Sequence, residues 1–155
     1  MSFFRSTLLL GASLVGAGAI ALVGAGAASA ESGINFTPGN DGLLNSGTGN
    51  SGILNGGTGN TGIANNLLGP GALNSGVANG LFGGSLNNGI ANQGNLNLGI
   101  ANIGTGNVGL ANIGVLNGGA VNVGTANGGL VQIGGGNLGA VNIGNGRTGL
   151  LRILG

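Results

Sequence analysis

The sequence lacks nearly every side chain that carries charge or takes part in acid–base chemistry. Its 155 residues include no histidine, cysteine, lysine, tyrosine or tryptophan. General acid–base catalysis needs a group that titrates near neutral pH, and none of the usual ones is present. Without cysteine, no disulfide framework or thiolate metal site can form. We therefore expect no catalytic residue, no metal site and no cofactor.

Positive charge is equally scarce. The basic residues are Arg5, Arg147 and Arg152, and the acidic ones are Glu31 and Asp41. Nucleic-acid binding requires several Lys or Arg side chains at the phosphates, and attraction to anionic lipids requires a polybasic segment. The composition therefore argues against a nucleic-acid partner and against a polybasic membrane patch.

Residues 1–30 differ in composition from the rest of the chain. One positive charge, at Arg5, precedes an apolar stretch that ends in small residues at Ala28 and Ala30, directly before Glu31. This pattern is typical of a helical signal peptide that is cleaved after Ala30, which predicts a secreted or cell-envelope protein. The alternative is an uncleaved anchor, because a bilayer span needs only ~20 uncharged residues. The protein would then meet a membrane through this segment alone.

What the chain has in excess is glycine, at regular positions. From Gly89 to Gly149 every fifth residue is glycine. Asparagine precedes each of these glycines by two residues from Asn87 to Asn142, except at Gln132. A period this strict indicates a repeat architecture.

The repeat defines the organisation of the chain. An asparagine comb with the same step of five occupies 31–66 and returns over 86–155. The step fails over 67–85, where Pro70 cannot donate a ladder hydrogen bond. We therefore predict a signal peptide at 1–30 and two repeat blocks, joined by an irregular break or bulging loop.

The five-residue unit favours extended structure. It reads small–Asn–aliphatic–Gly–x, as in residues 101–105 (Ala-Asn-Ile-Gly-Thr). A helix is unfavourable because each interior glycine costs ~1 kcal/mol relative to alanine, and a step of five matches no helical face. Short strands that turn at glycine suit the unit better. The pattern predicts an all-β solenoid whose stacked coils pair their backbones.

The unit resembles the pentapeptide-repeat family. It is most similar to the Asn-Gly-rich arrays of mycobacterial PPE proteins (the polymorphic tandem repeat group), whose pattern Asn-x-Gly-x-Gly-Asn-x-Gly matches residues 102–109 throughout. The resemblance implies a right-handed, four-sided solenoid with about twenty residues per coil. It also implies that the aliphatic residue and the small residue two before it point inward, and that the protein contacts a host. A signal-like segment stands here in place of the N-terminal helical domain of PPE proteins.

A second period suggests a different coil. Strong aliphatic residues recur every ten residues, at Ile103, Ile113, Val123, Ile133, Ile143 and Ile153. The alternative to the four-sided coil is therefore a flattened coil of ten residues, in which this set forms one column. Contact between Ile103 and Ile113 in stacked strands would distinguish the ten-residue coil from the four-sided one.

Two sets of side chains are candidates for a role. Stacked asparagine amides can hydrogen-bond along the axis as a structural ladder, with a polar surface for sugars or water as the alternative. The ladder candidates are Asn92, Asn102, Asn112, Asn122 and Asn142. The second set directly follows repeat glycines and is either buried or an outward apolar stripe, which would favour contact with the cell envelope or another copy of the chain. Its large members are Ile90, Ile100, Leu110, Leu130 and Leu150.

These observations predict a secreted, non-enzymatic repeat protein of the cell surface or envelope, with a structural or interaction role. One alternative is a self-assembling, amyloid-like matrix subunit, since Asn-rich chains of low charge are prone to β-aggregation. Another is an ice- or polysaccharide-binding module, suggested by the ten-residue spacing of Thr48 and Thr58. Arg147 and Arg152 replace asparagine in the last two units, where their charges disfavour the addition of another coil.

Overall fold

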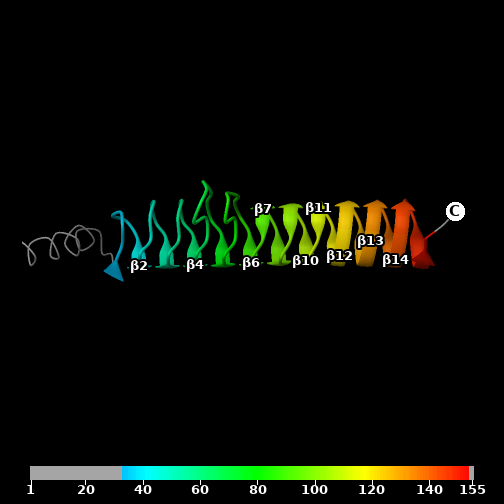
Figure 1. Ribbon diagram of the computed structural model, residues 1–155, viewed down its shortest axis with the longest axis horizontal. Helices are drawn as coiled ribbons and strands as arrows, with labels where there is room; N and C mark the ends of the chain where they lie inside the picture. The colour runs from blue at the N-terminus through cyan, green and yellow to red at the C-terminus, as the bar shows by residue number, and fades with distance from the viewer. Residues whose placement is uncertain (1–32, 154–155) are drawn as a thin grey trace, which may run out of the picture.

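The computed structural model describes residues 33–153, which form a straight rod of stacked coils (Figure 1). This part of the chain contains no helix. Its fifteen strands pair in parallel and build a β-solenoid of about 12 turns. The all-β architecture expected from the glycine period is confirmed. The signal peptide and its cleavage residues Ala28, Ala30 and Glu31 lie outside the described residues.

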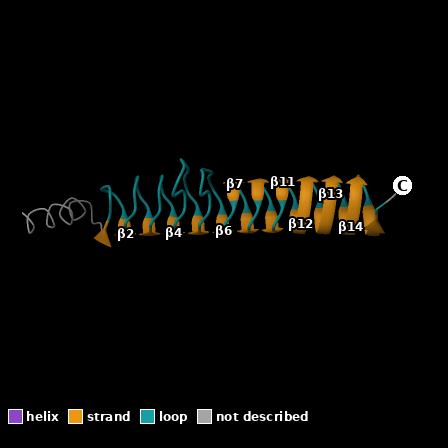
Figure 2. Cartoon of the chain, viewed as in Figure 1, coloured by secondary structure: helices purple, strands orange, loops and turns teal. Residues whose placement is uncertain are grey.

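The strands are short over most of the rod and longer at its C-terminal end (Figure 2). The short strands are β1 (Gly33–Ile34), β2 (Asp41–Leu43), β3 (Ser51–Ile53), β4 (Thr61–Ile63), β5 (Ser75–Val77), β6 (Asn88–Ile90), β7 (Gln93–Asn95), β8 (Leu98–Ile100), β9 (Ile103–Thr105), β10 (Val108–Leu110) and β11 (Ile113–Val115). The longer strands are β12 (Gly118–Thr125), β13 (Gly128–Gly135), β14 (Leu138–Asn145) and β15 (Thr148–Arg152).

The strand register advances in steps of ten along the repeat blocks. Ile113 in β11 is paired with Ile103 in β9 on one side and with Val123 in β12 on the other. The four-sided coil of twenty residues is therefore wrong, because it would place Ile103 next to Val123. A three-residue strand and a two-residue corner together use five residues, so two strands and two corners account for a step of ten.

Two rows of strands run along the rod. We name row A the series β1–β6, β8 and β10, continued by the first halves of β12–β14 and by β15. Row B comprises β7, β9, β11 and the second halves of β12–β14. In the N-terminal coils, row B is reduced to isolated bridges that join Thr48 to Thr58 and Thr58 to Ala72.

The central glycine of each short strand allows the coils to stack closely. A Cβ built on Gly109 would lie 1.9 Å from the carbonyl oxygen of Gly119 in the next coil. The backbone there has φ +124°, which L side chains rarely adopt. The fivefold glycine period therefore reflects backbone contact between coils rather than chain flexibility.

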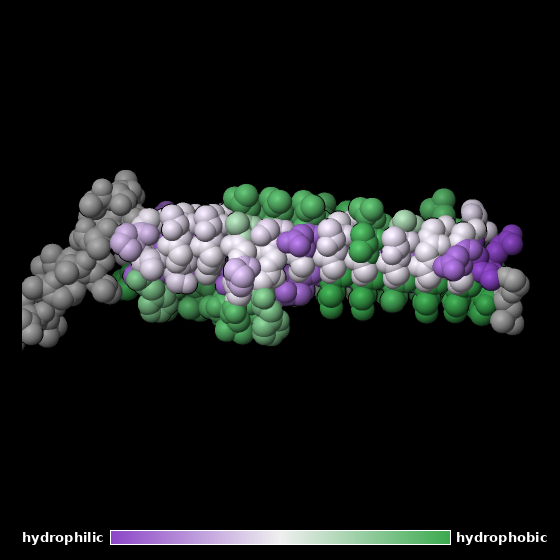
Figure 3. Space-filling model, turned by 90° about the horizontal axis from the view of Figure 1, so that it is seen from above, coloured by the Kyte–Doolittle hydropathy of each residue, from purple (hydrophilic) through white to green (hydrophobic). Residues whose placement is uncertain are grey.

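The interior of the rod is filled with amides, and no aliphatic side chain is buried within residues 33–153. Every buried side chain belongs to asparagine, except that of Gln132. Ile103 and Ile113 are 49% and 46% exposed, and Ala101 is exposed as well. The inward orientation that the resemblance implies for the aliphatic and small residues is therefore wrong. Apolar side chains instead form rows along both long sides of the rod (Figure 3).

The asparagine contacts continue through the segment 67–85. The backbone N–H of Asn74 donates to Oδ1 of Asn60, fourteen residues earlier, and that of Asn87 donates to Oδ1 of Asn74, thirteen residues earlier, both at 2.8 Å. These coils are longer than ten residues, and their extra residues form loops that project from the rod (Figure 1). Strand β5 lies between the loops and pairs with β4 and β6.

Candidate functional site

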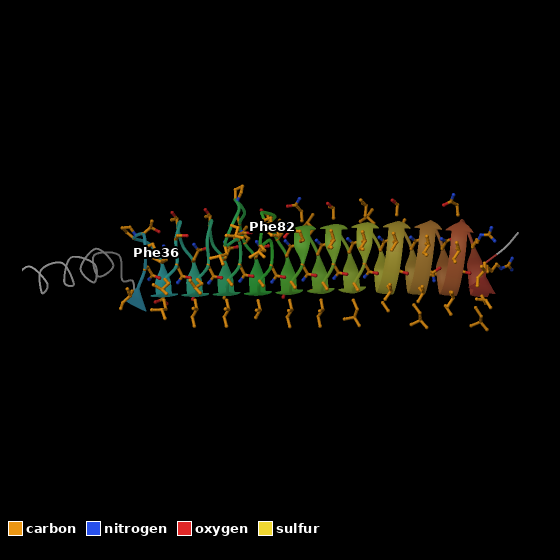
Figure 4. The ribbon with its side chains drawn as sticks, in the orientation of Figure 1. Phe36 and Phe82 are labelled. Atoms are coloured by element: carbon orange, nitrogen blue, oxygen red, sulfur yellow. The ribbon has the colours of Figure 1, made fainter. Side chains whose placement is uncertain are left out.

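Two columns of stacked amides occupy the two corners of the coils. The 102 column consists of Asn45, Asn55, Asn65, Asn79, Asn92, Asn102, Asn112, Asn122, Gln132 and Asn142, and the 107 column consists of Asn40, Asn50, Asn60, Asn74, Asn87, Asn97, Asn107, Asn117, Asn127 and Asn137. All are at most 2% exposed. Their polar atoms lie within the outline of the ribbon, while other side chains project outward (Figure 4).

Each amide ties neighbouring coils together, as Asn107 illustrates. Its backbone N–H and its Nδ2 both donate to Oδ1 of Asn97, at 3.0 and 3.1 Å. Nδ2 also donates to the carbonyl oxygen of Gly114 at 2.9 Å, and Oδ1 accepts from the backbone N–H of Asn117 at 3.0 Å. The columns are therefore structural ladders. Their burial excludes them as a polar surface for sugars or water.

The five ladder candidates from the sequence, Asn92, Asn102, Asn112, Asn122 and Asn142, all belong to the 102 column. The 107 column is its counterpart and was not among the named candidates. The sequence pattern that identifies the 107 column is the same asparagine comb, offset by five residues. Because a coil of ten residues contains two comb positions, one comb in the sequence becomes two columns in the structure.

The residue before each amide sets the shape of the corner. In the 107 column this residue has a left-handed backbone at every coil, for example at Leu96 with φ 58° and Leu116 with φ 56°. In the 102 column it is left-handed as far as Ala111, with φ 50°. Alanine and leucine pay a steric cost in this conformation, which the hydrogen bonds of the adjacent amide offset.

Valine replaces alanine at the last corners of the 102 column. Val121 and Val131 pair with each other, and Val131 pairs with Val141, within the continuous strands β12–β14. A β-branched residue strongly disfavours the left-handed conformation, so the backbone runs straight through these corners. This explains why β12–β14 each span eight residues where earlier coils have two short strands.

The straight corners interrupt the 102 ladder. The last backbone donor to an amide oxygen of this column is the N–H of Asn122, which donates to Asn112 at 3.1 Å. Oδ1 of Asn122, Oε1 of Gln132 and Oδ1 of Asn142 are buried and have no hydrogen-bond partner in the part of the chain that the structure describes. An unsatisfied buried polar atom costs about 1–3 kcal/mol. The C-terminal coils are therefore held mainly by the 107 column and by strand pairing.

The apolar stripe predicted from the sequence lies on the surface of row A. Ile90, Ile100 and Leu110 are the last residues of β6, β8 and β10 and are 48%, 45% and 51% exposed. Leu130 and Leu150 hold the same position in β13 and β15. They are 59% and 83% exposed. Of the two orientations considered for this set, the structure shows the outward one.

The stripe extends further towards the N-terminus than the predicted set. Row A adds aliphatic residues directly after its strand glycines at Ile34, Leu43, Ile53, Ile63 and Val77, which are 40–48% exposed. The sequence signal for these residues is the same, because each directly follows a glycine of the repeat. We name the row-A stripe the twelve residues Ile34, Leu43, Ile53, Ile63, Val77, Ile90, Ile100, Leu110, Ala120, Leu130, Ala140 and Leu150.

Other kinds of site find little support within residues 33–153. No group of three or more His, Cys, Asp or Glu side chains comes together there that could hold a metal ion. No helix in this part of the chain has the length and apolarity to cross a bilayer. Phe36 and Phe82 project from the surface and are 68% and 70% exposed (Figure 4).

Comparison of the chain with protein-family models, with curated proteins and with solved structures gives no match. The functional argument therefore depends on the geometry of the rod. Its distinctive features are an interior of amides and an exterior that carries all of the large aliphatic side chains.

Proposed function

We propose that the protein is a secreted, non-enzymatic structural rod of the cell surface or envelope. The observation that carries the proposal is the inverted packing: amides hold the coils together, and the aliphatic side chains remain on the surface. Exposed apolar rows of this extent usually mark an interaction surface. The signal-like pattern of residues 1–30 supports export.

The proposal includes the finer features of the solenoid. The coil is a flattened ten-residue turn of two pentapeptide units, wound in the right-handed sense of the pentapeptide-repeat proteins that the sequence resembles. The scarcity of titratable side chains supports a role without catalysis. In this view the repeats set the length of the rod, and the aliphatic positions set what it contacts.

Fractionation of the producing cells tests this proposal. We expect the chain in the medium or the envelope fraction, with an N-terminus at Glu31 when the mature protein is sequenced. A chain that keeps Met1 and remains in the cytoplasm would overturn both the export and the envelope role. A chain that keeps Met1 in the membrane fraction would replace secretion by anchoring through residues 1–30.

A self-assembling matrix subunit is the second candidate, because both ends of the rod present strands. Within residues 33–153, β1 pairs only with β2, and β15 pairs only with β14. Strand edges of this kind template further pairing, and amide ladders also occur in amyloid. Thioflavin-positive fibres that grow from purified protein at neutral pH would favour this function. A preparation that stays soluble and of fixed size would oppose it.

A further inference from the structure

We propose that two copies of the chain pair through the row-A stripe as antiparallel rods related by a two-fold axis. The inference depends on the observed rod and not on where the cell places it, so it goes beyond the proposed function. Its basis is an apolar column that runs along the whole described rod, next to a more polar column on the same strands.

The stripe is long and continuous. It has one position in each coil from Ile34 to Leu150, with the coils about 4.8 Å apart, so it extends for about 50 Å. Two-thirds of the stripe, from Ile34 to Leu110, contains only large aliphatic residues. Ala120 and Ala140 are the two small members near the C-terminal end.

The area is sufficient for a stable pair. Fully burying a Leu or Ile side chain removes on the order of 100 Å² of apolar surface from water, and the large stripe residues are close to half exposed. Ten such residues on each of two copies would bury on the order of 1,000 Å² in total, which is the lower bound for a specific interface. Leu98, Val108 and Leu138 on the same row add to this area.

Strand direction selects the antiparallel arrangement. All row-A strands run the same way, with the stripe at their C-terminal ends and a second outward column at their N-terminal ends. A two-fold axis parallel to the strands reverses the rod and places stripe against stripe. A two-fold axis along the rod would instead place the stripe against the second column, which begins with Asp41, Ser51, Thr61, Ser75 and Asn88.

Residue size supports a register with the axis between Ile90 and Ile100. In this register Ala140 of one copy faces Leu43 of the other, and Ala120 faces Ile63. No alanine meets an alanine, so the small residues leave room for larger ones. Isologous contacts of this kind close the assembly at two copies.

The end charges favour the same orientation. Asp41 lies near the N-terminal end of the described rod, and Arg147 and Arg152 lie at the C-terminal end. Antiparallel rods bring the acidic end of one copy to the basic end of the other. Parallel rods would instead bring like charges together at both ends.

Row B does not offer an equivalent surface. Its aliphatic column begins at Ile103, and the matching positions of earlier coils hold Ser46, Gly56 and Gln93. An antiparallel pair through row B would set Ile143 against polar or small residues. Row A is therefore the row that can match itself along its full length.

The test is the association state of the full chain in solution, measured by sedimentation equilibrium. We expect a dimer, and we expect the double substitution Ile90→Ser with Ile100→Ser to raise its dissociation constant by roughly 100- to 1,000-fold. The matched control is Ile103→Ser with Ile113→Ser on row B, where the side chains have nearly the same exposure. Circular dichroism of both variants verifies that the solenoid remains folded.

Orientation is tested with single cysteines, because the native chain has none. Asn88→Cys lies near the proposed axis and should form a disulfide-linked dimer on mild oxidation. A spin label at Ser51→Cys should report an intermolecular distance of about 35 Å, from seven coil steps of about 4.8 Å. A monomer at 100 µM, an open-ended polymer, equal weakening by the row-B control, or a short distance at Ser51→Cys would each overturn the proposal.

Discussion

The two amide columns differ at the C-terminal end of the rod, and the backbone conformation of their corners accounts for the difference. The 107 column passes its oxygen-to-N–H contact from coil to coil from Asn40 to the backbone of Arg147. The 102 column does so only as far as the N–H of Asn122, and the amide oxygens of Asn122, Gln132 and Asn142 have no partner within residues 33–153. The corner residue before the amide is left-handed at every coil of the 107 column and as far as Ala111 in the 102 column. From Val121 onward the corners of the 102 column are extended, and each unpartnered oxygen lies between two successive extended corners.

This comparison shows that a ladder depends on backbone conformation as much as on the amide. A left-handed corner turns the N–H of one amide residue towards the side-chain oxygen of the coil before it. Where two successive corners are extended, the same stretch of backbone forms strand pairs instead, as in the pairing of Asn122 with Gln132. Amides alone therefore do not make a complete column.

The largest expected effect comes from breaking the coil stacking on which both columns depend. Gly119→Ala would place a Cβ 1.9 Å from the carbonyl oxygen of Gly129, at φ +124°. We expect a loss of at least about 4 kcal/mol, because a clash with backbone cannot be relieved by a side-chain movement. Chemical denaturation followed by circular dichroism measures the loss.

The neighbouring residue provides the control. A Cβ on Gly118 has nothing within 4 Å, and its backbone φ lies outside the positive range. Gly118→Ala should change stability by less than about 1 kcal/mol and can increase it by restricting the unfolded chain. Equal losses in the two variants would contradict the close-stacking explanation of the glycine period.

The second effect separates the complete column from the interrupted one. Asn107→Ala removes a side-chain amide that makes five hydrogen bonds and strands the buried N–H of Asn117 and the carbonyl of Gly114, so we expect a loss of about 4 kcal/mol. Asn142→Ala removes an amide whose two donated bonds are 3.4 Å long and whose oxygen has no partner, so we expect about 1 kcal/mol. Similar losses at both sites would show that the ladder bonds contribute little.

Amide hydrogen exchange is the suitable readout for this pair, because solenoids open locally rather than as one unit. In the Asn107→Ala variant, loss of protection should centre on residue 117 and the neighbouring coils. In the Asn142→Ala variant it should remain within β13–β15. The unchanged protein provides the reference for both exchange patterns.

The sequence predicts the stacking of the coils better than it predicts the orientation of their side chains. The strict glycine and asparagine periods indicate short strands, tight corners and a ladder, and these features are present. The predicted turn at glycine is wrong, because the repeat glycine lies at the centre of each three-residue strand and the asparagine lies at the corner. The predicted inward orientation of the aliphatic residues is wrong. A three-residue strand with glycine at its centre has no alternation of apolar and polar side chains that would indicate which face is buried. Ile103 and Gly118 differ greatly in volume although both follow a ladder asparagine, which fits an exposed position better than a packed one.

A clear pattern in the sequence indicates the coil size, whereas the pattern that indicates the corner conformations is weaker. The ten-residue spacing of Ile103 and Ile113 matches the observed register, whereas the coil of twenty residues came from the family resemblance. Left-handed alanine and leucine at repeated corners run against local preference and are stabilised only by contacts between coils. In the sequence, the conformation of the corners is indicated only by the residue before the amide, which changes from alanine at Ala111 to valine at Val121.

The third prediction concerns a substitution that should extend the interruption of the 102 column by one coil towards the N-terminus. Ala111 has φ 50°, and Ala111→Val should straighten this corner, so that it and Val121 form two successive extended corners and Oδ1 of Asn112 loses the N–H of Asn122. We expect a loss of about 2 kcal/mol from backbone strain and the unpaired oxygen. Ala111→Gly is the control, since glycine adopts the left-handed corner without strain and should preserve the contact of Asn112 with the N–H of Asn122. Equal losses of stability in the two variants, measured by chemical denaturation, would exclude the corner as the cause.

The smallest expected effect is the repair of the 102 column. Val121→Ala, Val131→Ala and Val141→Ala, combined with Gln132→Asn, would give the last coils the sequence of the earlier ones. We expect β12–β14 each to divide into two short strands and stability to rise by about 1 kcal/mol, since the new hydrogen bonds exceed the lost valine contacts by a small margin. Gln132→Asn alone should bring no gain, because an extended corner leaves its amide oxygen unpaired. If the single substitution stabilised the protein as much as the fourfold one, the identity of the amide would matter, and the conformation of the corner would not.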